Sequence, residues 1–159
     1  MNDTAHSSLR FQMSPLLFLV GIFFLNFLAR IILSPLMPAV EKDLKIGHDQ
    51  AGSLFLIISL GYCVGLLASG FITSRLCHRK TIFLSSIAVG FGLMIVSVSH
   101  NLWAIRSGLI FIGVAAGFYL PSGIATLTEL VRPEHWGKAI AIHELAPNLG
   151  FVIAPLLAE

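Results

Sequence analysis

Five long hydrophobic runs dominate the chain, and short polar connections separate them. A helix that crosses a bilayer core of about 30 Å needs about 20 mostly apolar residues, and each run meets this requirement. The alternation of polar and apolar positions that marks a membrane β-barrel is absent, so strands are not expected. The pattern predicts an all-α integral membrane protein with about five transmembrane helices, over residues 15–40, 51–73, 81–99, 102–130 and 138–158.

The first 14 residues are polar and mixed, and they are interpreted as a cytoplasmic tail. No small-residue cleavage site follows the first hydrophobic run, so that run is expected to be a retained helix and not a signal peptide. Pro15 suits the first turn of such a helix.

Composition supports lipid as the main solvent of the chain. Of the 159 residues, 56% are hydrophobic and 11% are charged, and the mean hydropathy is +0.88. Soluble domains carry about 25% charged residues. A net charge of +2 gives no reason to expect a nucleic-acid partner. Cys63 and Cys77 lack any metal-ligand spacing and are expected to be free thiols.

The distribution of Lys and Arg between the connections predicts the orientation. With a cytoplasmic N-terminus in the inner (plasma) membrane, the outer connections hold only Lys42 and Lys45. The inner segments hold the six other connection cations, Arg10, Arg75, Arg79, Lys80, Arg132 and Lys138. Trp103 and Trp136 lie near opposite span ends, as interfacial aromatic residues do.

Three of the expected spans carry polar residues at helical spacing, which must face protein or a watery cavity. These residues are Asn26, Arg30 and Ser34 in the first span, Tyr119, Ser122 and Thr126 in the fourth, and Glu144 and Asn148 in the fifth, where His143 lies beside Glu144. Spans one, four and five are therefore expected to line a cavity.

Arg30 is the most informative of these residues, because an arginine within the bilayer costs at least ~2.5 kcal/mol on insertion scales. Its planar fork of donors matches a carboxylate, nitrate or phosphate group, so an anion site is one interpretation. Asn26, one turn earlier, is expected to share its hydrogen bonds. A structural pair with a buried acid and snorkelling toward the outer interface are the alternatives.

Glu144 and His143 are the candidates for proton coupling. Glu144 is the one acid well inside an expected span, and the histidine side chain titrates near neutral pH. A counter-ion role for Glu144 and a packing role for His143 are the alternatives. Adjacent helical residues point about 100° apart, so the two need not share a face.

Small residues and prolines add expectations about packing. Gly61 and Gly65 form one small-xxx-small pair, and Gly113 and Gly117 form another, for which close helix packing is the simplest interpretation. Two prolines, Pro121 and Pro147, are expected to interrupt spans four and five and to permit bends.

Enzymatic motifs fail on inspection. His143-Glu144 begins a zinc-protease pattern, but Pro147 occupies the position of the second histidine. No glycine-rich run ends in Gly-Lys-Ser or Gly-Lys-Thr, so a phosphate loop is not expected. The sequence therefore predicts no enzyme, no metal site and no cofactor.

One connection carries a family signature. Residues 70–80 read GFITSRLCHRK, which resembles the inner-loop motif of the major facilitator superfamily, Gly-x-x-x-Asp-Arg-x-Gly-Arg-Lys. Gly70, Arg75, Arg79 and Lys80 match the motif, and Ser74 stands where the family has Asp.

Other segments agree with this resemblance. The segment that follows Arg30 is similar to the end of the first helix in anion-carrying members, where an arginine contacts substrate. Gly61-Tyr62, residues 113–121 and residues 150–155 resemble the second, fourth and fifth helices of the family. The resemblance implies twelve helices in two halves, each made of two inverted three-helix repeats.

With five spans, the chain is expected to be an incomplete N-terminal six-helix half: a fragment, a truncated product or one piece of a split protein. The predicted function is secondary transport of a small anionic solute by alternating access, with possible proton coupling through Glu144 or His143. Arg30, Asn26, Tyr62 and Tyr119 are the expected solute-binding residues. The expected partners are the bilayer, the solute and the remaining helices. A non-transporting assembly or regulatory subunit is the alternative.

Overall fold

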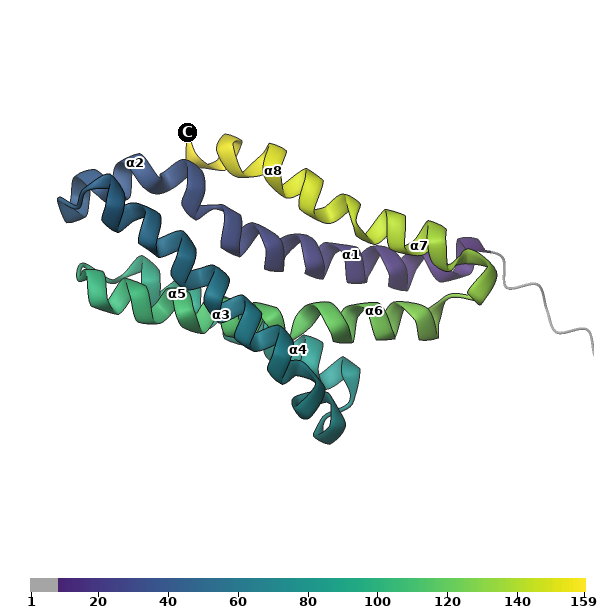
Figure 1. The fold of residues 1–159 in the computed structure, drawn as a ribbon. Helices are drawn as coiled ribbons and strands as arrows, with labels where there is room; N and C mark the ends of the chain where they lie inside the picture. The colour runs from purple at the N-terminus through teal and green to yellow at the C-terminus, as the bar shows by residue number, and fades with distance from the viewer. Residues whose placement is uncertain (1–8) are drawn as a thin grey trace, which may run out of the picture.

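A computed structural model describes residues 9–159 of the chain, with side chains from Met13 onward, and this part contains helices and turns but no strands (Figure 1). The helices are α1 (Leu9–Ile31), α2 (Leu33–Leu44), α3 (His48–Arg75), α4 (His78–Ser97), α5 (Leu102–Gly117), α6 (Tyr119–Leu130), α7 (Trp136–His143) and α8 (Leu145–Ala158), with a short 3₁₀ turn, η1, at Pro133–His135.

Five helical runs are long and apolar enough to cross a membrane, which confirms the expected fold class. They are Met13–Leu44, His48–Arg75, His78–Ser97, Leu102–Leu130 and Pro133–Ala158. Several begin or end a few residues away from the expected boundaries, because polar residues at the span ends continue the helix. Of the expected tail over residues 1–14, residues 1–8 lie outside the described residues, and the rest belongs to α1.

Three of the five spans are broken at a proline. α1 ends at Ile31, α5 at Gly117 and α7 at His143, and each of these ends lies four residues before a proline: Pro35, Pro121 and Pro147. Proline has no N–H to donate to the carbonyl four residues earlier, and its ring crowds that carbonyl. The expected interruptions in spans four and five are confirmed, and the break in the first span is an addition.

The tightest packing in the molecule is the crossing of α3 and α5. All four glycines of the two expected pairs meet here, because a Cβ at Gly61 would lie 2.6 Å from the Ile110 carbonyl oxygen, and one at Gly117 would lie 2.5 Å from that of Tyr62. Only glycine allows two backbones to approach so closely. The packing interpretation of the glycine pairs is confirmed.

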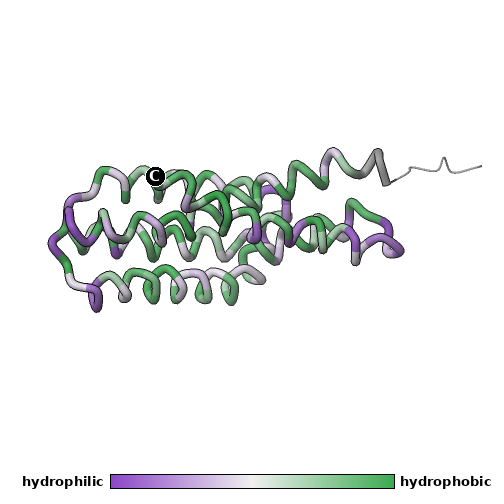
Figure 2. Tube along the Cα trace, turned by 90° about the horizontal axis from the view of Figure 1, so that it is seen from above, coloured by the Kyte–Doolittle hydropathy of each residue, from purple (hydrophilic) through white to green (hydrophobic). Residues whose placement is uncertain are grey.

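The fourth span lies at the centre of the bundle. In its most apolar 18-residue stretch, 56% of the residues are buried, against 22–33% in the corresponding stretches of the other spans. This is because α5 packs on α3 and α4, while α6 packs on α4 and α1. In Figure 1, α1 runs between α8 and α6. Figure 2 shows hydrophobic residues along the spans and hydrophilic residues mainly at the connections.

We name the two ends of the bundle by their connections. The basic end carries the α3–α4 and α6–α7 connections, with Arg75, Arg79, Lys80, Arg132 and Lys138. The opposite end carries the α2–α3 and α4–α5 connections. At the opposite end, the Asn101 side chain accepts a hydrogen bond from the Trp103 amide at the start of α5. The backbone of Lys45 is left-handed and ends α2, with its N–H donating to the Glu41 carbonyl oxygen.

Candidate functional site

Arg30 is held face-on by an aromatic ring. It lies in the last turn of α1, and its guanidinium carbon is 4.0 Å from the centre of the Tyr62 ring on α3 and 5.3 Å from that of Phe27. Such a contact contributes about 2 kcal/mol or more when it is desolvated. Tyr62 follows Gly61, whose close approach to α5 fixes this part of α3. The ring contact therefore holds the cation in place inside the bundle.

The hydrogen-bonding capacity of Arg30 is incompletely used. Its Nε is buried without a hydrogen-bond partner, and no carboxylate lies within 4.0 Å of it among the side chains that the structure describes. A structural pair with a buried acid is thus not seen in this part of the chain. The described residues therefore provide no acceptor for Nε, and the guanidinium has a donor that an external acceptor could use.

The side chain of Asn26 contacts α4 and not Arg30. It is 3% exposed, and its Nδ2 donates to Ser85 Oγ on α4 at 3.4 Å. Ser85 in turn donates to the Ala115 carbonyl oxygen at 2.7 Å. The structure therefore does not bring Asn26 and Arg30 together by a hydrogen bond. The third member of the expected stripe, Ser34, lies beyond the helix break and is exposed.

A second cluster stacks three rings in the core. Phe23 of α1 packs against both His143 and Tyr119, with ring centres 4.3 and 5.2 Å away, and the centres of the His143 and Tyr119 rings are 6.1 Å apart; all three planes are nearly parallel. Tyr119 and His143 are both fully buried. The Tyr119 hydroxyl donates to the Leu19 carbonyl oxygen at 2.8 Å and lies 3.3 Å from His143 Nε2. The expected solute-binding residue Tyr119 is thus placed in a closed contact between α1, α6 and α7.

Glu144 links this buried cluster to the surface of the chain. It occupies the break between α7 and α8, and its side chain is 48% exposed. Its Oε1 lies 3.2 Å from His143 Nδ1. Adjacent residues in a regular helix diverge by about 100°. The interruption at Pro147, together with the rotatable glutamate side chain, allows this neighbouring pair to meet.

The inner-loop residues lie apart from both clusters, around the α3–α4 connection at the basic end. Gly70, Arg75, Arg79 and Lys80 are all exposed. The Arg75 guanidinium carbon lies 5.1 Å from the centre of the Phe71 ring, and none of these cations pairs with a carboxylate among the described side chains.

Arg106, near the opposite end, resembles Arg30 in its aromatic contact and in its buried, unpaired Nε, but it has a hydrogen-bond partner at another nitrogen. It donates to Ser53 Oγ at 3.3 Å, and its guanidinium carbon lies 5.1 Å from the centre of the Trp103 ring. It therefore links α5 to α3 and offers a comparison for Arg30.

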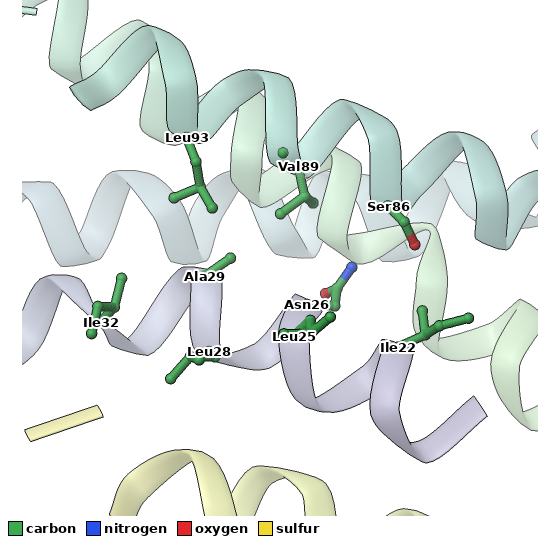
Figure 3. A pocket seen from close by; sticks show the side chains of 10 residues that line it. Ile22, Leu25, Asn26, Leu28, Ala29, Ile32, Ser86, Val89 and Leu93 are labelled. Atoms are coloured by element: carbon green, nitrogen blue, oxygen red, sulfur yellow. The ribbon is translucent and has the colours of Figure 1, made fainter. Parts of the chain in front are cut away.

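Two hollows on the described chain lie away from Arg30, His143 and Glu144. An open groove of about 420 Å³ runs between α1 and α4, and its lining is apolar apart from Asn26 and Ser86 (Figure 3). A second hollow, of about 520 Å³, shares Ile22 and Ser86 with it and continues toward Arg79. The apolar lining of the groove between α1 and α4 suits hydrocarbon, so we do not place a charged solute in that groove.

Phe23, Phe27 and Ser85 contact the expected site residues but were not among them. Phe23, Phe27 and Arg30 do share one helical face by their spacing, and that signal is present in the sequence. Ser85 carries no such signal, because only the packing of α4 on α1 and α5 gives it two partners.

The topology and the inner-loop motif agree with a sequence comparison that covers nearly the whole chain. The sequence model of the Major Facilitator Superfamily matches residues 19–159. The chain belongs to this superfamily. The family resemblance expected from the motifs is therefore confirmed, together with a multi-pass membrane location.

Several curated proteins are similar to this superfamily member. It is 25% identical over 126 residues to the glucose transporter GlcP of Staphylococcus epidermidis, covering 79% of this chain and 28% of GlcP. It is 30% identical over 134 residues to the uncharacterized MFS-type transporter YceJ of Bacillus subtilis (80% and 34%). It is 27% identical over 128 residues to the chromaffin granule amine transporter of Rattus norvegicus (78% and 25%).

The chain thus spans about a quarter to a third of the length of these relatives. Their names mention glucose and amine, so they give no support to the expected likeness to anion-carrying members, which stays a prediction.

Proposed function

We propose that this chain is the N-terminal part of a secondary transporter that moves a small anionic solute across the membrane by alternating access. The superfamily assignment and the names of the similar proteins support transport. The remaining helices of the full transporter would complete the cavity wall. A role as a non-transporting subunit has no comparable support, and nothing in the described site favours an enzymatic reaction.

The surroundings of the Arg30 side chain are the observation that supports an anionic solute. The guanidinium carbon lies over the Tyr62 ring, Nε is buried without an acceptor, and no described carboxylate lies within 4.0 Å. A carboxylate, nitrate or phosphate group can accept two parallel hydrogen bonds from a guanidinium. We assign Arg30 and Tyr62 to the solute. Asn26 and Tyr119, which are buried with hydrogen-bond partners of their own, take supporting positions.

Glu144 and His143 are the proposed proton carriers. Glu144 is half-exposed, while His143 is enclosed, so the pair connects an accessible group with a buried one. A carboxylate and an imidazole that share a contact can hold or release a proton as their surroundings change.

The proposed orientation places the N-terminus and the basic end in the cytoplasm of a plasma or inner membrane. Five of the cations in the connections lie at the basic end, including the inner-loop motif residues Arg75, Arg79 and Lys80. Cytoplasmic connections are enriched in Lys and Arg.

Uptake of labelled carboxylate, nitrate and phosphate into vesicles that contain the full transporter tests the site. Arg30→Gln removes the charge, and losing a charge-assisted hydrogen bond costs about 1.5–3 kcal/mol. We expect at least about a tenfold loss of apparent affinity for the transported anion, since about 1.4 kcal/mol corresponds to tenfold.

Arg106→Gln is the matched control, because Arg106 is also a half-buried arginine against an aromatic ring but lies near the opposite end. Its anion affinity should stay within about twofold of the parent. Equal affinity in Arg30→Gln and the parent would remove Arg30 from the site, and uptake of neutral sugars alone would refute an anionic solute.

A further inference from the structure

Both ring nitrogens of His143 contact a neighbour, and only certain proton arrangements satisfy both contacts. Nε2 lies 3.3 Å from the Tyr119 hydroxyl oxygen, and Nδ1 lies 3.2 Å from Glu144 Oε1. The imidazole is fully buried, so each contact must be a hydrogen bond or an unfavourable meeting of lone pairs.

The hydroxyl of Tyr119 decides the first contact. A carbonyl oxygen only accepts, so the 2.8 Å contact with the Leu19 oxygen takes the one hydrogen that the hydroxyl has. The hydroxyl oxygen then faces His143 as an acceptor. Nε2 must therefore carry a hydrogen, and it donates to Tyr119.

The second contact follows from the first. A neutral imidazole with its hydrogen on Nε2 has a bare lone pair on Nδ1, and an ionised carboxylate only accepts. These two atoms would repel each other at 3.2 Å unless a proton lay between them. That proton belongs either to an imidazolium beside a carboxylate or to a neutral carboxyl group that donates to Nδ1.

We infer that the His143–Glu144 pair holds one extra proton in this structure, and that Tyr119 is a positioning residue that keeps the hydrogen of neutral His143 on Nε2. The structure is then the proton-loaded form of the coupling site. Its link to solute movement rests on the proposed function, whereas the protonation of the pair does not.

Release of this proton has a structural consequence. One N–H or O–H bond breaks, and the proton passes to water on the exposed side of Glu144. A neutral imidazole and a carboxylate remain, with two lone pairs in contact. Because Tyr119 opposes a shift of the ring hydrogen from Nε2 to Nδ1, Glu144 must turn away from the ring. Proton loss is thereby coupled to a movement at the α7–α8 break.

Other titratable groups around His143 do not compete for this proton. On α1, the ring of Phe23 covers one face of the imidazole, and on α6 the facing group is Tyr119. The remaining ionisable residues with described side chains on α1, α6, η1, α7 and the end of α8 form no hydrogen bond or ion pair with His143; they are Arg30, Glu129, Glu134, His135, Lys138 and Glu159.

Nitrogen NMR of ¹⁵N-histidine-labelled chain in lipid nanodiscs tests the inference without transport. His143→Gln identifies the His143 resonances, and spectra are recorded between about pH 5 and 8, where histidines titrate. We expect Nε2 to carry a hydrogen throughout, while Nδ1 shifts as the pair loses its proton. His48, which is exposed and lies 2.9 Å from Glu41 with no hydroxyl contact at Nε2, serves as an internal reference.

Two variants separate the contributions. Tyr119→Phe keeps the ring against Phe23 but removes the oxygen, so the Nδ1–H form of neutral His143 should appear. In Glu144→Gln the amide can donate to Nδ1, so the pH-dependent shift of Nδ1 should be lost. A wild-type neutral ring with a bare Nε2, or an unchanged form in Tyr119→Phe, would overturn the inference. If the spectra agree with the inference but the full transporter moves no solute, the result would instead count against the proposed function.

Discussion

Two titratable side chains inside the bundle differ in how completely their nitrogen atoms are hydrogen-bonded. Arg30 has a ring against its face but an unpaired Nε, whereas His143 has a partner at both nitrogens and a ring against its plane. An unpaired donor inside a protein is costly and calls for an acceptor. Arg30 is therefore suited to reversible binding of an external acceptor, whereas His143 is suited to holding a proton within the protein.

Tyr62 should matter to Arg30 through its ring and not through its hydroxyl. Tyr62→Leu removes the cation–π contact, which contributes about 0.5–2 kcal/mol, so we expect a roughly two- to thirtyfold weaker affinity for the transported anion. Tyr62→Phe keeps the ring and should stay within about twofold of the parent. The concentration dependence of uptake measures both, and an equal loss in the two variants would show that the hydroxyl matters instead.

At this scale the sequence shows which residues are exceptional but not what they touch. Arg30 and Glu144 are conspicuous because charges are rare inside spans. The partners Tyr62 and Phe23 become evident only when α3 and α7 are packed against α1. The Asn26 side chain was expected to share hydrogen bonds with Arg30, four residues away. Because α4 packs on α1, the Asn26 amide donates to Ser85 instead.

The elements follow from the local sequence more directly. Hydrophobic length predicts five spans, and the structure has five. Proline chemistry predicts the breaks, since each interrupted helix ends four residues before Pro35, Pro121 or Pro147. Other prolines, such as Pro38 and Pro155, lie within assigned helices, so the residue type alone does not determine where a break is visible.

The contact between α3 and α5 should be intolerant of a single added methyl group. A Cβ at Gly65 would lie 3.0 Å from Gly117 Cα and would also clash with the Val114 carbonyl oxygen. Overpacking costs about 1–3 kcal/mol, so Gly65→Ala should lower the thermal unfolding temperature of the chain in detergent.

Gly90→Ala is the control for this substitution. Gly90 also lies inside a helix but has no atom within 4 Å of an added Cβ. Both variants gain the same helix propensity, about 1 kcal/mol, so only packing distinguishes them. Equal unfolding temperatures for Gly65→Ala and Gly90→Ala would contradict the close crossing.

The arrangement of the spans is the part that the sequence leaves open. Small residues on span two and span four predict close packing, and they do pair with each other. The central position of α5 and α6 depends on contacts with α1, α3 and α4 together. No local pattern contains that information, because it concerns residues far apart in the chain.

Native cysteines provide a test of the proposed orientation. Cys77 is exposed at the basic end, while the other thiol, Cys63, lies within the second span. In a Cys63→Ser background, a membrane-impermeant maleimide should label Cys77 only when it is added to the cytoplasmic side. A His100→Cys variant without native cysteines should give the reverse result. Labelling of Cys77 from outside intact cells would show that the orientation is the opposite of the proposed one.

The glycine crossing has a consequence for how the bundle can move. Two backbones in direct contact have no side chains between them whose rotamers could change, so α3 and α5 form a rigid block. The contact between α1 and α8 is different, because the Phe27 side chain lies over Gly150 and can reorient. Any relative sliding of helices should occur along that second boundary, which lies between the helix that carries Arg30 and the helix that follows Glu144.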